Sequence, residues 1–164
     1  MQENPYREDS ELLQELLRQF ENLKNGRAHS FIEEDSFEKI IDYYQEQDDL
    51  KSAMSAVEIA CEQYPYSAML LIKKADILLA RRQYAAALDI LDQAALFDST
   101  DVNLYILKTE VYLALDQQEK AVQLLEEAIA QFEGEERIEL LFELADVYDD
   151  YEDFDKVFDC LKLI

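Results

Sequence analysis

The stretch KSAMSAVEIACEQYP, residues 51–65, decides the fold, because its pattern returns twice further along the chain. The chain reads AAALDILDQAALFDS at residues 85–99 and EKAVQLLEEAIAQFE at residues 119–133. A fixed period of this length is typical of helical repeat arrays, in which each unit packs on its neighbours. In each copy two alanines flank an aliphatic residue, and equivalent residues of successive copies are 34 positions apart. These residues are Ala53, Val57 and Ala60; Ala87, Leu91 and Ala94; and Ala121, Leu125 and Ala128.

The period extends to larger apolar residues on either side of the alanines. Two further columns at the same spacing are Tyr44, Leu78 and Tyr112, and Leu50, Tyr84 and Gln118. A fourth copy follows after a shift of 36, with the extra residues near Gly134, and comprises Ala145, Tyr148, Phe154, Val157 and Leu161. We therefore divide the chain into four units, 34–67, 68–101, 102–137 and 138–164, of which the last is incomplete.

Each unit is expected to form two helices joined by a tight turn. Apolar residues recur at intervals of three and four within a unit, and this pattern changes phase once near the middle. The turns fall at QEQDDL, ARRQY, LDQQE and DYEDF, while Pro65, Asp98 with Ser99, and Gly134 separate the units. The expected helices are 35–47, 50–64, 68–81, 84–97, 102–115, 118–132, 138–150 and 154–163.

These units resemble the tetratricopeptide repeat family, whose helix pairs carry a small residue in the first helix and two alanines in the second. The matching residues are Phe37, Tyr44, Ala53, Ala60 and Pro65; Leu71, Ala75, Tyr84, Ala87 and Ala94; Tyr105, Tyr112, Ala121 and Ala128; and Leu144, Ala145, Tyr148 and Phe154. The departures are Lys74, Lys108, Thr109, Glu133 and Val157. The resemblance implies an all-α, right-handed helical-repeat solenoid that binds a protein or peptide along a concave groove.

The composition favours helices and excludes several classes of function. Two Gly and two Pro are too few for sheets rich in turns or for phosphate-binding loops. A formal net charge of −23 repels nucleic acids and anionic membranes, so we expect neither as a partner. One histidine excludes a multi-histidine metal site and most catalytic triads, so we expect no enzyme activity and no cofactor.

The N-terminal part of the chain, residues 1–33, lies outside the period. The segment SELLQELLRQFENLKNG has an apolar face that predicts a capping helix over the first unit, with Ser10 as its N-cap and Gly26 as its end. The connector that follows contains the only histidine, His29, which is expected to be solvated. The first ten residues lack the features of a signal peptide, so a cytoplasmic protein is expected.

The resemblance places the first helix of each unit along the groove, and the residues at its groove-facing places include one acidic column. That column is Asp42, Asp76, Glu110 and Asp146. Further candidate groove residues are Met69, Ile72, Leu79, Asn103, Ile106, Leu113, Phe142 and Asp149. Acidic and aliphatic side chains together suit a segment with Lys or Arg beside aliphatic anchors. Alternatively, Lys39 with Asp42 and Lys73 with Asp76 form ordinary intrahelical pairs, and the ligand is uncharged or binds elsewhere.

The C-terminal segment has two features that need separate interpretations. DVYDDYEDFDK, residues 146–156, lacks the glycine of a calcium loop, and we expect Tyr148 and Phe154 in the core instead. The end, FDKVFDCLKLI, is apolar where helical arrays usually finish with a polar face. This favours either a longer repeat array or self-association through the last helix. Cys61 and Cys160 are expected to be reduced thiols.

Overall fold

In the computed structural model, which describes residues 5–27 and 31–164, with side chains from residue 9 onward, every regular element is an α-helix. The elements are α1 (Pro5–Lys24), α2 (Glu34–Glu46), α3 (Leu50–Gln63), α4 (Ala68–Ala80), α5 (Tyr84–Phe97), α6 (Val102–Ala114), α7 (Gln118–Ile129), α8 (Gly134–Asp150) and α9 (Phe154–Lys162). The predicted all-α fold class is therefore confirmed. His29 lies outside the described residues.

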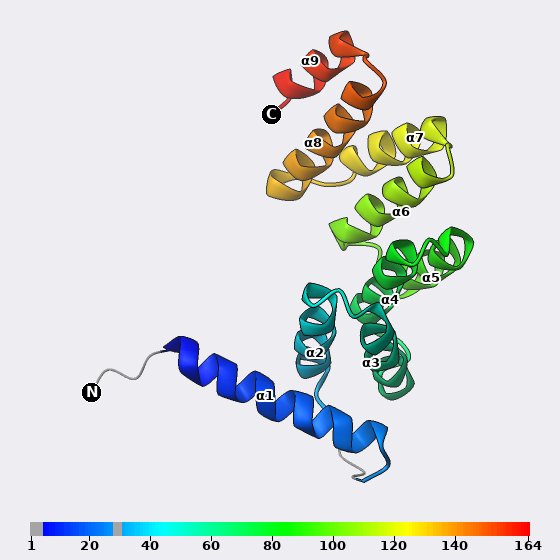
Figure 1. Ribbon diagram of the computed structural model, residues 1–164. Helices are drawn as coiled ribbons and strands as arrows, with labels where there is room; N and C mark the ends of the chain where they lie inside the picture. Colours follow the sequence, from blue (N-terminus) through cyan, green and yellow to red (C-terminus); the bar gives the residue numbers. More distant parts are fainter. Residues whose placement is uncertain (1–4, 28–30) are drawn as a thin grey trace.

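Helices α2 to α9 form an array of helix pairs. Each helix packs against the next, and the first helices of neighbouring pairs, α2, α4, α6 and α8, also contact one another in order. Figure 1 shows the pairs following one another from the α1 end to the α9 end of an elongated molecule. The exact division of the chain into a cap and four units stays a prediction.

The recurring alanines form the contact surface between helices, as their spacing predicts. Ala53, Ala87 and Ala121 are completely buried, and so are the second alanines of each copy. Between them, Val57, Leu91 and Leu125 are completely buried as well. A methyl group at these places allows close approach of two helix backbones, while the larger aliphatic residue fills the space beside it.

Each turn within a pair has the same backbone conformation. Asp48, Arg82, Asp116 and Glu152 have φ between 56° and 59°, the left-handed region. In the first turn the Asp49 amide donates to the Tyr44 carbonyl at 2.9 Å and the Asp48 amide to the Gln45 carbonyl at 2.9 Å. The other three turns repeat this pair of bonds, which defines a Schellman motif that satisfies the last helical carbonyls. The four predicted turns are confirmed.

Three helix ends differ from the sequence-based prediction by more than one residue. Helix α1 begins at Pro5 rather than after Ser10, because proline is favoured in the first helical turn, where its missing N–H costs nothing. Helix α8 begins at Gly134 rather than at residue 138, since Glu135 and Glu136 stabilise the positive end of a helix dipole. Helix α7 ends at Ile129 rather than at residue 132. Gly26, at φ 67°, follows the end of α1 as predicted.

The prediction that Phe154 belongs to the core is wrong, whereas Tyr148 is buried as expected. Phe154 is 64% exposed, because α9 packs on α8 and no helix in the described part of the chain covers its other side. Phe158, Leu161, Leu163 and Ile164 are exposed for the same reason. The apolar end predicted from the sequence is thus an exposed face of α9. Neither cysteine forms a disulfide; Cys160 is buried and Cys61 half-buried.

Candidate peptide-binding groove

The first helices of the pairs enclose a hollow, which we call the central hollow. Its volume is about 330 Å³. It brings together six of the twelve candidate groove residues, namely Met69, Ile72, Asp76, Asn103, Ile106 and Glu110, with four others, Glu38, Lys73, Asp101 and Leu107. Helix α2 contributes one of these side chains, and the remainder come from α4, from α6 and from the residue that caps α6. The hollow is therefore lined by both aliphatic side chains and carboxylates.

The other six candidates do not line the central hollow. Leu79 and Leu113 are half-buried in α4 and α6, while Asp146 and Asp149 are exposed on α8. Phe142, also on α8, is 49% exposed. Asp42 lines a separate pocket beside α1. The structure therefore groups the candidates of the middle pairs and leaves those of α8 as a surface beyond them.

The acidic column is partly neutralised, but by different partners from those expected. Lys73 does not pair with Asp76 on its own helix; its ammonium reaches back to Asp42 on α2 and lies 3.7 Å from Glu38. Asp76 instead accepts a hydrogen bond of 2.7 Å from the amide of Gln45. An extended lysine on α4 reaches α2 because the two helices are adjacent. The α2 end of the column thus already holds a cation.

Towards α8 the carboxylates face one another without such a cation. Burial raises the pKa of Glu110, and the charges of Asp76 and Glu143 add to this shift. Burial likewise raises the pKa of Glu143, with contributions from Asp146 and Glu139. Each of these shifts means that the ionised form is disfavoured in the folded protein. A cation placed between α4, α6 and α8 would relieve this repulsion.

The sequence interpretation overlooked Glu143, although the repeat contains a signal for it. The column next to the acidic one reads Lys39, Lys73, Leu107 and Glu143, since these positions share the spacing of 34, 34 and 36. The first two positions of this second column are lysines, the third is a leucine and the fourth is a glutamate. Together the two columns separate a neutralised half of the face from an unneutralised one.

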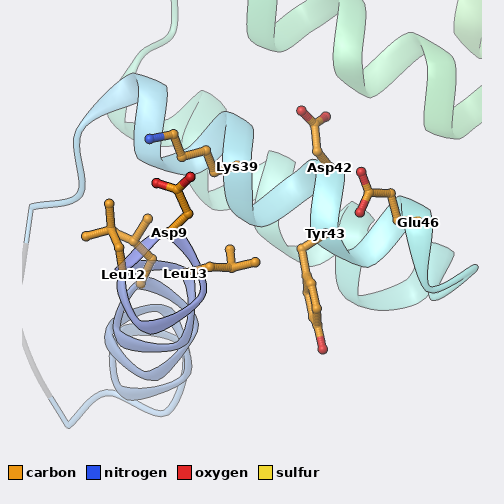
Figure 2. Close-up of a pocket in the computed structure, with 8 residues that line it drawn as sticks. Asp9, Leu12, Leu13, Lys39, Asp42, Tyr43 and Glu46 are labelled. Atoms are coloured by element: carbon orange, nitrogen blue, oxygen red, sulfur yellow. The ribbon is translucent and has the colours of Figure 1, made fainter. Parts of the chain in front are cut away.

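A second pocket, the α1 pocket, lies between α1 and α2 and has a volume of about 440 Å³. In Figure 2, Asp9, Leu12 and Leu13 project from α1, and Lys39, Asp42, Tyr43 and Glu46 project from α2. Leu16 completes the lining. Asp42 belongs to this pocket and also binds Lys73 of the central hollow, so the two cavities are neighbours.

Helix α1 is fixed to α2 at its C-terminal half, which defines one wall of this pocket. Phe20 is completely buried and meets the ring of Tyr44 edge-on, with 6.1 Å between ring centroids. The Tyr44 hydroxyl donates to the Glu21 carboxylate at 3.2 Å. Burial and this carboxylate raise the pKa of Tyr44 to about 12. The capping helix predicted from the sequence therefore packs on the first pair through its C-terminal half.

Solved structures of repeat proteins superimpose on this arrangement. A variant of a putative kinesin light chain with nearly identical TPR-like repeats, from Podospora anserina, gives a TM-score of 0.71 at 17% identity and covers 94% of this chain and 86% of its own. The chain has the tetratricopeptide repeat fold. A thermophilic TPR protein of Thermus thermophilus gives a TM-score of 0.70 at 16% identity, covering 90% of this chain and 77% of its own.

MamA of Desulfovibrio magneticus is similar in the same way, with a TM-score of 0.68 at 19% identity over 93% of this chain and 89% of its own. No protein-family model matches the sequence, and no curated protein matches it.

Across residues 5–27 and 31–164, no helix is long and apolar enough to cross a membrane. The same residues contain no group of three or more His, Cys, Asp or Glu side chains that could hold a metal ion.

Proposed function

We propose that this protein is a non-enzymatic scaffold for protein–protein interactions, which binds a basic segment of a partner along the face formed by α4, α6 and α8. The single observation that carries this proposal is the unneutralised set of carboxylates beside an aliphatic hollow. Burial raises the pKa of Glu110, and the charges of Asp76 and Glu143 add to this shift. Burial also raises the pKa of Glu143, with contributions from Asp146 and Glu139. The tetratricopeptide repeat fold, which presents helix faces along an array, is consistent with this role.

The chemistry of the hollow defines the partner segment. Met69, Ile72 and Ile106 offer apolar surface to aliphatic side chains, and the surrounding carboxylates suit Lys or Arg. The net charge of −23 adds a long-range attraction that raises the rate of encounter with a cationic partner. An acidic segment would be repelled by the same field. The site contains no nucleophile with an adjacent base, so binding is the chemistry that it supports.

Charge reversal in the hollow tests this proposal. The probe is a labelled synthetic peptide of Lys and Leu, arranged to form an amphipathic helix, and its binding is followed by fluorescence anisotropy. The double variant Asp76→Lys with Glu110→Lys is expected to weaken binding by more than about tenfold, which corresponds to ~1.4 kcal/mol. Binding by the natural protein is expected to weaken as salt rises, because exposed charges are screened beyond about 8 Å at physiological ionic strength.

The matched control is Glu58→Lys with Asp89→Lys, which changes the net charge equally at exposed positions of α3 and α5. This control is expected to bind the peptide nearly as well as the natural protein, apart from the lost long-range attraction. If both double variants bind equally well, or if binding does not depend on salt, the hollow is not the recognition site and the proposal is wrong.

An alternative role is that of a structural module that self-associates or docks on further repeats through α9. The observation in its favour is the exposed apolar face of that helix, where Phe158 is 60% exposed. Static light scattering at increasing concentration tests self-association: a rise toward the dimer mass supports this alternative, and a constant monomer mass contradicts it. A cytoplasmic location remains part of the proposal and is tested by localising a tagged copy in the source cell.

A further inference from the structure

The apolar stripe of α1 is buried at one end of the helix and open at the other. Phe20 is completely buried and Leu16, about one turn nearer the N-terminus, is 8% exposed, but Leu12, about one further turn away, is 51% exposed. Figure 1 shows the reason: the N-terminal half of α1 extends away from the array, to the left of α2 in this view. The two helices therefore leave a wedge between them, and the α1 pocket is this wedge.

The α1 pocket is lined by both apolar and charged side chains. Leu12, Leu13 and Leu16 supply the wall, and Tyr43 closes it from α2. Its volume of about 440 Å³ lies within the range of ~300–1,000 Å³ that is usual for ligand pockets. Because Leu12 is exposed, part of this apolar wall remains in contact with water in the free protein. Covering that surface with an apolar partner would be favourable.

The charged side chains around the pocket favour an occupant with a positive charge. Three carboxylates line it, those of Asp9, Asp42 and Glu46, against a single amine, that of Lys39. Asp42 is already bound by Lys73 from α4, so Asp9 and Glu46 remain as two acids against one lysine. In Figure 2, Asp42 and Glu46 project to the same side of α2. An occupant with Lys or Arg beside its apolar residues complements this pocket better than a neutral or acidic one.

We propose that the α1 pocket is a second anchor site, which takes the aliphatic face of a partner helix flanked by Lys or Arg. The helix lies in the wedge between α1 and α2 and places its aliphatic residues, spaced by three and four, against Leu12, Leu13 and Tyr43. This inference rests on the proposed function, because Asp42 joins the α1 pocket to the central hollow. The partner segment is then bipartite, with one part in each cavity.

Substitutions at exposed positions test the anchor without disturbing the fold. Leu12→Ser removes apolar surface from the pocket, and Glu46→Lys reverses one charge, while Leu16 and Phe20 still hold α1 in place. The probes are the Lys–Leu peptide and a matched peptide in which every Leu is replaced by Gln. Leu12→Ser is expected to weaken binding of the Lys–Leu peptide by about fivefold, equal to ~1 kcal/mol, and to leave the Lys–Gln peptide unchanged.

Glu46→Lys is expected to weaken binding of both peptides, whereas the control Glu58→Lys on α3 changes neither beyond the loss of long-range attraction. The inference is overturned if Leu12→Ser and Glu46→Lys bind like the natural protein while Asp76→Lys with Glu110→Lys does not; the proposed function then stands alone. The reverse pattern supports the α1 pocket and contradicts the central hollow. A natural protein that binds neither peptide overturns both.

Discussion

At the scale of single residues, the repeated alanines carry the packing of the array. Ala87 on α5 is completely buried, so leucine at this position must push two helices apart. Such overpacking costs about 1–3 kcal/mol. We expect Ala87→Leu to lower the melting temperature in calorimetry, while Ala86→Leu, one residue earlier on an exposed face of the same helix, has little effect. Equal melting temperatures for the two variants would contradict the assigned packing.

Arg82 occupies a backbone conformation that suits glycine better. Its φ of 59° lies in the left-handed region, which costs most L-residues roughly 1–2 kcal/mol. Arg82→Gly removes this strain and is expected to raise the free energy of unfolding in urea by up to about 1 kcal/mol, after the entropy cost of glycine. The neighbouring Arg81 has φ −83°, so Arg81→Gly is expected to destabilise the protein. The opposite order would show that the turn is unstrained.

Glu110 makes stability depend on pH. Since burial raises its pKa above the usual 4.5, the folded state keeps the proton to higher pH than the unfolded state does. Its contribution is therefore most favourable below 4.5 and is lost as pH rises through the raised pKa. We expect Glu110→Gln to raise the melting temperature at neutral pH and to match the natural protein near about pH 4.

The control for this pH dependence is Glu58→Gln, which removes one exposed carboxylate from α3. If it changes the melting temperature at neutral pH as much as Glu110→Gln does, net charge rather than the local cluster is responsible. The roles of Ala87 and Glu110 show what the sequence can predict at this scale. Recurrence identifies buried alanines and an acidic column, but the partners of a long side chain such as Lys73 depend on distances between helices.

At the scale of elements, α1 depends on a few contacts with α2. Phe20→Ala removes a completely buried ring, a change that typically costs about 3–5 kcal/mol. Because α1 packs mainly on α2, we expect this loss as faster hydrogen exchange of α1 amides, with α4 to α7 unchanged. Tyr44→Phe, which removes only the hydrogen bond to Glu21, is expected to accelerate exchange much less. Exchange that rises throughout the array instead would show that α1 is an integral part of its core.

The sequence predicts helices better than helix ends. The periodic apolar residues predict the first residues of helices α2 to α7 to within one residue. The turns between paired helices share a repeated Schellman motif. The starts of α1 and α8 depend on local features that periodicity does not contain, Pro5 and the acidic turn after Gly134. Phe154 was misplaced because the repeat pattern assumes a following helix, and α9 has none in the described residues.

At the scale of the whole molecule, charge and architecture act together. The net charge of −23 is spread over an array whose first helices bring acids from successive pairs close together. Sequence alone identifies those acids, because their spacing equals the repeat. It does not reveal that Lys73 neutralises one end and that α1 opens a second pocket, since both depend on how helices from different units meet. Along the face formed by the first helices, the charge therefore changes from partly neutralised at the α2 end to acidic toward α8.

We propose that this face recognises cationic, partly apolar segments, and a comparison of two peptides on the natural protein tests this proposal. Dissociation constants are measured for the Lys–Leu peptide and for a Glu–Leu peptide of identical length and pattern, at low and at high salt. We expect the Lys–Leu peptide to bind far more tightly and to lose affinity as salt rises, whereas the Glu–Leu peptide is expected not to bind at low salt. Equal affinities for the two peptides, or tighter binding of the Glu–Leu peptide, would contradict it.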